Sequence, residues 1–354
     1  MGLGLALSAL FFTSCNSDDD GYQPTPDSDG EYQHGVFILN EGNFGGGNAT
    51  VSFLSDEGVL SQDIYGKVNN EPLGDVAQSI YLNDDLAFIV LNGSGKIEVV
   101  NRYTFEKQAT ISGGLSNPRY MTILNGKGFV TNWGDPTNPS DDYVAVINLS
   151  NYTVESTIPV SEGPEQITSA NGKLFVAQMG GWGYGNSVSV INPGSQTVTS
   201  TISVGDVPES MVVVNDALIV LSSGKASWTG DETQGALTAI DTMTGLVLGS
   251  SQFSAGSHPT KLAQAGGNLY YTLGDQIYKT GTDASGWSSA GLLFSTAVDG
   301  VFGAYGFAVN NDRIYIGDAG DYTSDGSVFI YNTSGAFLSS YTVGPLPNGF
   351  GFNE

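Results

Sequence analysis

One four-part pattern occurs twice between Tyr143 and Met211. The first copy reads YVAVINLSNYTVESTIPVSEGPEQI and the second reads SVSVINPGSQTVTSTISVGDVPESM. Each copy has an alternating apolar strand, a turn after Asn, a second strand rich in Thr and Val, and a glycine shortly before Pro-Glu. Alternation with a period of two is typical of a strand with one face in a core. A unit repeated every roughly 20–50 residues indicates a solenoid, a propeller or another array.

The same unit extends along the chain, and one apolar residue after each turn of this kind marks it. Successive markers lie between 41 residues (Ile80 to Met121) and 51 residues (Met211 to Leu262) apart. A polar turn, a β-rich strand, a variable loop and a third strand follow each of the first six markers. Four short strands in roughly 40–50 residues are typical of a propeller blade. The markers are Ile80, Met121, Ile167, Met211, Leu262, Phe307 and Phe350.

The two ends of the chain each contain part of one unit. The seventh marker lies in PLPNGFGFN at the C-terminus with no strand after it, whereas GVFILNEG and ATVSFLS near the N-terminus have no marker before them. We therefore predict an all-β fold, a single seven-bladed β-propeller with four-stranded blades over residues 34–354. Pro347–Asn353 would supply the inner strand of the blade that begins at Val36 and so remove an exposed edge. A pair of β-sandwiches or a β-helix is the alternative.

Composition argues against several classes of function. The chain has 354 residues, a formal net charge of −25 and a pI of about 4.1. Nucleic-acid binding requires a basic face, so no nucleic-acid partner is expected. Docking on an anionic membrane by charge is not expected either. The single cysteine cannot form a disulfide framework.

Residue types that carry catalysis or bind metals are scarce. The only histidines are His34 and His258, and the sequence lacks HExxH, GxSxG and a Cys/His cluster. A zinc site or a nucleophilic triad therefore lacks its usual parts, and we predict no catalytic residue, no metal and no cofactor. Acids cluster in residues 135–142 and 318–325. We expect these acids to lie in solvated turns. The alternative is a calcium site, which needs several converging oxygens.

The first residues predict export and a lipid anchor. Residues 2–12 are apolar, and Thr13 and Ser14 precede Cys15. An apolar stretch that ends in small residues is typical of a secretory signal. With the cysteine directly behind it, the segment 1–15 resembles a bacterial lipoprotein signal, which implies that Cys15 is acylated. A plain signal peptide is the alternative.

The segment that follows is acidic. Residues 16–33 contain six acids and no bases, so we expect a disordered tether. The run Asp18–Asp20 resembles the export signal of Bacteroidetes lipoproteins, which implies the outer membrane and its cell-surface face. An acidic linker that carries no export signal is the alternative.

Aromatic side chains gather in the variable loops between the second and third strands of the blades. In a four-stranded blade these loops open on the same face as the loops before the inner strands. Surface loops commonly carry function, so we predict that these rings contact a ligand, with packing between loops as the alternative. They are Phe44, Trp133, Trp182, Tyr184, Trp228 and Tyr322.

Polar residues at the starts of the inner strands are expected to ring the channel mouth on that same face. Among them, Arg119, Gln166 and Tyr305 are predicted to contact the ligand. A face with aromatic platforms, amides and charges suits a large, flat ligand with apolar and amide edges. The ring consists of Gln78, Arg119, Tyr120, Glu165, Gln166, Glu209, Lys261, Tyr305 and Asn348.

Two stretches of the chain resemble known families. The units PEQITSANGKLFVAQ and SVSVINPGSQTVTSTISVG resemble the YVTN-type β-propeller repeat of surface-layer and YncE-like proteins, over about residues 35–353. The opening stretch VFILNEGNFGGGNATVSFLS looks like that of Bacteroidetes surface lipoproteins, among them the BtuG-like group. That resemblance implies capture of cobalamin and its transfer to a TonB-dependent transporter.

The sequence therefore favours a binding protein rather than an enzyme. Its ligand would be a bulky small molecule, for which the resemblance implies cobalamin or another corrinoid. Its partner would be a TonB-dependent outer-membrane transporter, and the lipid anchor would be its only contact with the membrane. One alternative is a propeller lyase or a quinoprotein-like enzyme. Another is a structural or adhesive surface protein that binds glycan or protein.

Overall fold

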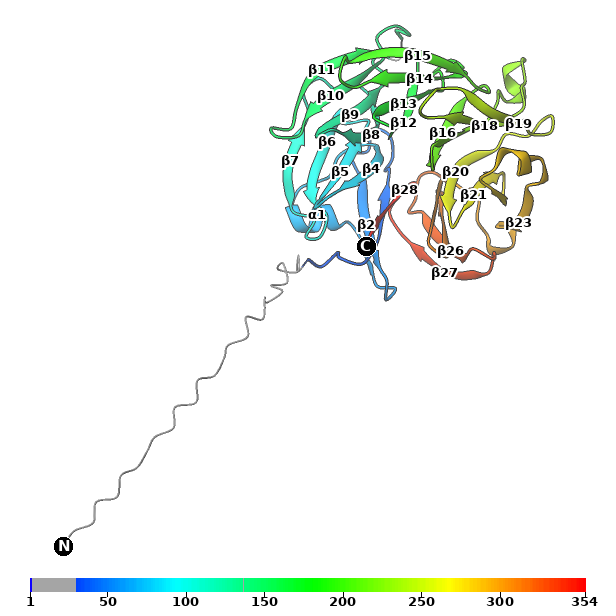
Figure 1. The fold of residues 1–354 in the computed structure, drawn as a ribbon. Helices are drawn as coiled ribbons and strands as arrows, with labels where there is room; N and C mark the ends of the chain where they lie inside the picture. The colour runs from blue at the N-terminus through cyan, green and yellow to red at the C-terminus, as the bar shows by residue number, and fades with distance from the viewer. Residues whose placement is uncertain (2–29, 136) are drawn as a thin grey trace.

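A ring of β-sheets surrounds a central channel (Figure 1). The structure, a computed structural model, describes Met1, residues 30–135 and residues 137–354. Cys15, the acidic run behind it and most of the expected tether lie outside the described residues. Within them the strands form seven four-stranded antiparallel sheets, so the predicted seven-bladed β-propeller is confirmed. No helix in the described part of the chain is long and apolar enough to cross a membrane.

Each blade contains four strands, which follow one another from the channel outward. Blade one has β28 (Pro347–Asn353), β1 (Gly35–Asn40), β2 (Thr50–Ser55) and β3 (Leu60–Ser61). Blade two has β4 (Ala77–Asn83), β5 (Leu86–Leu91), β6 (Lys96–Asn101) and β7 (Lys107–Ile111). Blade three has β8 (Pro118–Leu124), β9 (Lys127–Asn132), β10 (Tyr143–Asn148) and β11 (Thr153–Pro159). Blade four has β12 (Pro164–Ala170), β13 (Lys173–Gln178), β14 (Ser187–Asn192) and β15 (Thr197–Ser203).

The remaining blades follow the same order. Blade five has β16 (Pro208–Val214), β17 (Ala217–Ser222), β18 (Ala236–Asp241) and β19 (Val247–Gln252). Blade six has β20 (Thr260–Ala265), β21 (Asn268–Leu273), β22 (Gln276–Gly281) and β23 (Gly291–Ser295). Blade seven has β24 (Gly306–Asn310), β25 (Arg313–Asp318), β26 (Ser327–Asn332) and β27 (Phe337–Thr342). Short helices occur at α1 (Ile64–Asn69), η1 (Ser227–Thr229), η2 (Ala284–Ser289) and η3 (Ala297–Asp299).

The C-terminal strand closes the ring. β28 pairs antiparallel with β1, with Val36 opposite Phe352 and Ile38 opposite Phe350. The Asn353 side chain also donates hydrogen bonds to the carbonyl oxygens of Tyr32 and Arg102. β1 therefore has a strand partner on its channel side, as the second strands of the other blades do, and the predicted closure is confirmed.

The core lies between neighbouring blades rather than in one central layer. Phe175 and Val190 of blade four, for example, pack against Leu218 and Val220 of blade five in one buried cluster. The second and third strands of the blades are buried almost throughout, whereas the outer strands alternate toward solvent. Burial of one such aliphatic side chain contributes about 1.5–3 kcal/mol, so every pair of adjacent blades is held by its own apolar contacts.

Candidate functional site

Six inner strands have a bulge at their first residues, and only β24 has none. In β8, Pro118 pairs with Asn132 and Met121 pairs with Val130, which leaves two residues outside the ladder. β12 has the same irregularity, whereas β4, β16, β20 and β28 each leave one residue outside the ladder. A bulge changes the direction of the side chains that it carries, and here these side chains line a cavity in the channel. They are Gln78, Arg119, Tyr120, Glu165, Gln166, Glu209, Lys261 and Asn348.

A residue with a left-handed backbone conformation, at positive φ, directly precedes five of the inner strands. A residue other than glycine in this region costs on the order of 1–3 kcal/mol, and β-branched residues are especially disfavoured. At Gly163 a Cβ atom would lie 1.8 Å from the backbone nitrogen of Gly181, so only glycine fits there. The left-handed turns set the direction in which the chain reaches the channel wall. They occur at Val76, Asn117, Gly163, Val207 and Leu346, with φ between 48° and 64°.

The bulged residues line a cavity of about 460 Å³ at the mouth of the channel. All nine residues expected to ring the mouth contribute to its wall. Sequence reasoning missed Glu41 and Met179, which also line it. Each follows the last residue of the second strand of its blade, as Trp133 does in blade three, and that shared position in the repeat is the signal that could have identified them.

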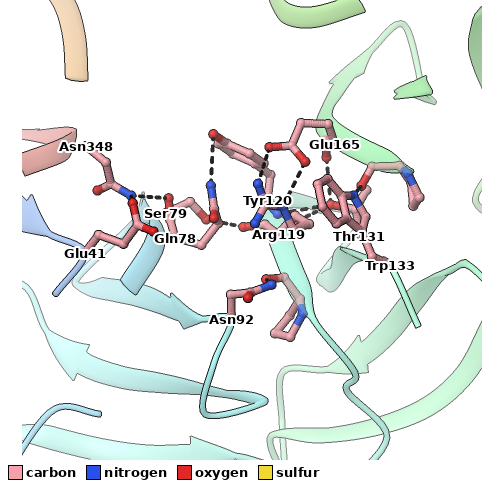
Figure 2. A network of polar contacts seen from close by, with 12 residues as sticks. Glu41, Gln78, Ser79, Asn92, Arg119, Tyr120, Thr131, Trp133, Glu165 and Asn348 are labelled. Carbon is pink, nitrogen blue, oxygen red and sulfur yellow. Dashed lines mark hydrogen bonds and ion pairs between the residues drawn. The ribbon is translucent and has the colours of Figure 1, made fainter. Parts of the chain in front are cut away.

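Arg119 is held between an acid and an aromatic ring (Figure 2). Its Nε and Nη2 atoms each lie 2.8 Å from a carboxylate oxygen of Glu165. The guanidinium carbon lies 4.2 Å from the centre of the Trp133 ring, whose N–H donates to the carbonyl oxygen of Pro164 at 3.1 Å. Burial lowers the pKa of Arg119, but the Glu165 carboxylate outweighs this effect and the net result is a raised pKa. The Arg119 cation is therefore fixed in place.

A second acid lies across the cavity. Glu41 accepts a hydrogen bond of 2.5 Å from the Tyr305 hydroxyl and a longer one of 3.4 Å from Asn348 (Figure 2 shows Glu41 and Asn348). Burial raises the pKa of the Glu41 carboxyl, and the bond from Tyr305 partly opposes that shift. Burial and the neighbouring Glu41 also raise the pKa of Tyr305. The Oδ1 atom of Asn348 is buried and has no partner among the described residues.

The third acid faces blade six. Glu209 accepts from the backbone N–H of Lys261 at 3.3 Å, and burial raises the pKa of the Glu209 carboxyl. Nearby, the Oε1 atom of Gln166 accepts from the backbone N–H of Met211 at 2.7 Å. The Nε2 atom of Gln166 then has no partner in the described part of the chain. The wall thus offers both free donors and free acceptors to a ligand.

The acids expected in solvated turns divide into two groups. Asp142 and Asp318 are buried, contrary to that expectation, and accept from the backbone N–H groups of Gly163 and Phe302, respectively. Asp135 and Asp321, which stabilise turns, are exposed. Asp321 accepts from the backbone N–H groups of Thr323 and Ser324, and Asp135 accepts from that of Thr137. Within the described residues, no group of three or more His, Cys, Asp or Glu side chains is placed to hold a metal ion. The turn interpretation of these acids fits their contacts better than the calcium alternative.

The rings predicted to contact a ligand lie at different depths. Trp133 is half-buried and, with Tyr305, belongs to the cavity wall, as do Arg119 and Gln166. Tyr322 contacts Tyr305 at 5.7 Å between ring centres. The other predicted rings lie on loops of the same face, outside the cavity. They are Phe44, Trp182, Tyr184, Trp228 and Tyr322, with exposed fractions from 49% for Tyr322 to 89% for Phe44.

Comparisons with known proteins identify a family and a fold. A protein-family model described as "Domain of unknown function (DUF5074)" matches residues 34–336. No curated protein matches the chain. A functionally unknown protein from Desulfotomaculum acetoxidans is similar in structure, with a TM-score of 0.65 and 12% identity over 90% of this chain and 98% of that one.

Two further solved structures are similar. One is a quinonprotein alcohol dehydrogenase-like protein from Bacteroides thetaiotaomicron, with a TM-score of 0.64 and 14% identity over 91% of this chain and 79% of that one. The other is hydrazine synthase from Kuenenia stuttgartiensis, with a TM-score of 0.62 and 15% identity over 77% of this chain and 88% of that one. At these identities the similarity shows the fold alone.

Proposed function

This chain belongs to the DUF5074 family, and we propose that it is a ligand-binding protein that captures a bulky small molecule at the mouth of the propeller channel. The observation that carries the proposal is the set of bulged strands that turn polar and aromatic side chains into one cavity of about 460 Å³. This volume lies in the range of about 300–1,000 Å³ that is usual for small-molecule sites. The free amide nitrogen of Gln166 is available to the ligand.

The ligand that we propose is a corrinoid, such as cobalamin. A corrinoid has apolar faces and a fringe of amides. The amide N–H groups would donate to Glu41, and the amide oxygens would accept from Gln166. A molecule of this size extends beyond the cavity, so its outer part would lie against the exposed rings of Trp182 and Trp228.

The setting of this capture is also part of the proposal. Acylation at Cys15 would anchor the protein in the outer membrane, with the propeller on the cell surface. A TonB-dependent transporter would then receive the bound ligand, and the protein would release it unchanged. The support is the apolar stretch before Cys15 and the acidic run behind it.

A thermal-shift screen of the purified protein with cyanocobalamin, haem and neutral oligosaccharides tests the proposed ligand. A ligand at about one hundred times its Kd stabilises the folded state by about 2.7 kcal/mol. For a chain of this length we expect the Tm to rise by about 4 °C with cyanocobalamin only. A shift with haem or an oligosaccharide and none with cyanocobalamin would reject the corrinoid.

A further inference from the structure

A second cavity, of about 260 Å³, lies between blades five and six. It shares no residue with the cavity at the channel mouth. Blades five and six are neighbours in the ring, as Figure 1 shows for β19, β20 and β21. In blade six the second and third strands are joined by the tight turn between Leu273 and Gln276, where blade five has the loop that contains Trp228. Blade six contributes Trp287 and Ala290 to the wall from the connection between β22 and β23, which contains η2.

The wall of the second cavity carries no charge. Its eleven lining residues include no Asp, Glu, Lys or Arg, although the chain has 36 acidic residues. A charged ligand would lose its hydration there without an opposite charge to replace it, and this loss is costly. The lining is Leu237, Ser251, Gln252, Phe253, Ser254, Ser257, Tyr271, Leu273, Tyr278, Trp287 and Ala290.

Two tyrosines in this wall depart from the repeat. Tyr271 and Tyr278 face each other across β21 and β22, and their rings stack at 5.3 Å with an angle of 1° between their planes. The other six blades have Ile or Val where blade six has Tyr271, so packing of a blade does not require an aromatic residue there. These equivalents are Ile38, Ile89, Val130, Val176, Val220 and Ile316.

Polar atoms of the wall are free. Tyr271 is only 2% exposed, yet its hydroxyl makes no hydrogen bond within the described residues. By contrast, the Trp287 N–H donates to the carbonyl oxygen of Gly281 at 3.1 Å, and the Tyr278 hydroxyl donates to Gln276 at 2.8 Å. The Tyr271 hydroxyl is not among the buried unpaired atoms of the described residues, so it is accessible from the cavity and free to bond water or a ligand there. Burial and the nearby Tyr278 raise the pKa of Tyr271, so its hydroxyl keeps its proton.

We propose that this second cavity binds a neutral sugar ring. A sugar ring has an apolar C–H face, which would lie against the stacked aromatic wall, and hydroxyls that both donate and accept hydrogen bonds. The Tyr271 hydroxyl would meet the buried edge of the sugar. The hydroxyls of Ser251, Ser254 and Ser257 would meet its outer edge, since they too have no partner among the described residues. The volume, slightly below that of drug-sized sites, fits a single ring.

Calorimetry with methyl α-glucopyranoside, N-acetylglucosamine, glucuronate and adenosine tests this proposal. Saturable binding of at least one of the two neutral sugars is expected, with glucuronate weaker. Tyr271→Phe removes only the free hydroxyl and should weaken that binding roughly fivefold, the usual effect of losing one hydrogen bond. Ser257→Ala gives a second, milder test at the rim.

The matched control is Tyr270→Phe. Tyr270 is equally buried on the same strand but packs toward blade seven, so its change should leave sugar binding intact. Absence of neutral-sugar binding at millimolar concentration, equal binding of glucuronate, or binding of adenosine alone would overturn the proposal. Corrinoid binding should be the same in Tyr271→Phe and the wild type, which separates this test from that of the proposed function.

Discussion

Buried charges at the channel mouth are held by specific partners. Arg119 uses two of its nitrogens on Glu165 and covers one face of Trp133. Removing a charge from water costs several kcal/mol, and only good geometry offsets that cost. These contacts therefore make the mouth a rigid, pre-formed surface.

Glu165→Gln tests the importance of this ion pair. The change leaves Arg119 buried without an opposite charge, so we expect the free energy of unfolding in urea to fall by roughly 3 kcal/mol. The matched control is Glu155→Gln, which breaks the more exposed pair with Lys127 and should cost less than about 1 kcal/mol. Equal losses in the two variants would contradict the assignment.

Asp142 gives the fold a dependence on pH. Burial, together with the nearby Asp141 and Glu162, raises the pKa of Asp142 from 3.8 to about 6. A hydrogen bond from the Gly163 N–H lowers this pKa but does not cancel the increase. The folded state thus holds this proton more tightly than the unfolded state does. The stability contributed by the protonated carboxyl is fully present below about pH 4 and is lost as the pH rises through about 6.

Asp142→Asn should therefore raise the free energy of unfolding at about pH 7 and leave it nearly unchanged at about pH 4. The asparagine carries no charge and keeps an oxygen for the Gly163 N–H. Urea denaturation at the two pH values measures the effect. Asp325→Asn, at an exposed turn, is the control and should change stability by the same amount at both. An equal change at both pH values for Asp142→Asn would refute the pKa assignment.

The inner strands and the variable loops have separate roles in the site. The bulged starts of six inner strands build the cavity wall, whereas the loops between second and third strands carry exposed rings around it. Trp182 and Trp228 come from blades four and five, with exposed fractions of 74% and 86%. Rings on neighbouring blades can cover a ligand that is wider than the cavity.

Trp182→Ala and Trp228→Ala should each weaken corrinoid binding roughly thirtyfold, because loss of one aromatic anchor typically costs about 2 kcal/mol. Calorimetry with cyanocobalamin measures this. Phe337→Ala is the control, since this half-exposed ring lies on the outer strand β27, at the end of the blade away from the loops. Trp287 cannot serve as a control because it is 4% exposed and packs in the core. Unchanged binding in both tryptophan variants would exclude the loops from the site.

Across the whole molecule, the sequence repeat predicted the blades well. Each of the seven markers lies in an inner strand, because the same alternation and turn recur in every unit. The bulges were not predictable, since nothing in the sequence Pro118-Arg119-Tyr120 indicates that two of its residues lie outside the hydrogen-bonded ladder. The helix α1 was also missed. It is six residues long and is held by burial of Ile64 and Tyr65 rather than by its own pattern.

The candidate site was predictable only in part. Position in the repeat placed Arg119, Gln166 and Tyr305 correctly at the channel mouth, because equivalent positions of all blades converge there. Trp133 was expected only on a loop of the same face, yet it belongs to the cavity wall. The pairing of Arg119 with Glu165 could not be predicted, because it joins side chains from different blades. Whether the exposed loop rings contact a ligand stays a prediction.

Deletion of residues 345–354 tests closure of the ring. The change removes β28, so β1 would lose its inner partner and present an open edge to other molecules. We expect aggregation in size-exclusion chromatography and a lower Tm. Removal of Glu354 alone is the control and should leave the protein monomeric. A truncated protein that stays monomeric with an unchanged Tm would show that β28 is dispensable.

The most direct test of ligand capture is a calorimetric titration of the purified protein with cyanocobalamin. We predict one-to-one binding with a micromolar or lower Kd and recovery of the ligand unchanged afterwards. Gln166→Ala should weaken this binding, since it removes the free amide from the cavity wall. Absence of any heat of binding at micromolar concentrations would contradict the corrinoid as ligand, and a chemically altered ligand would contradict capture without turnover.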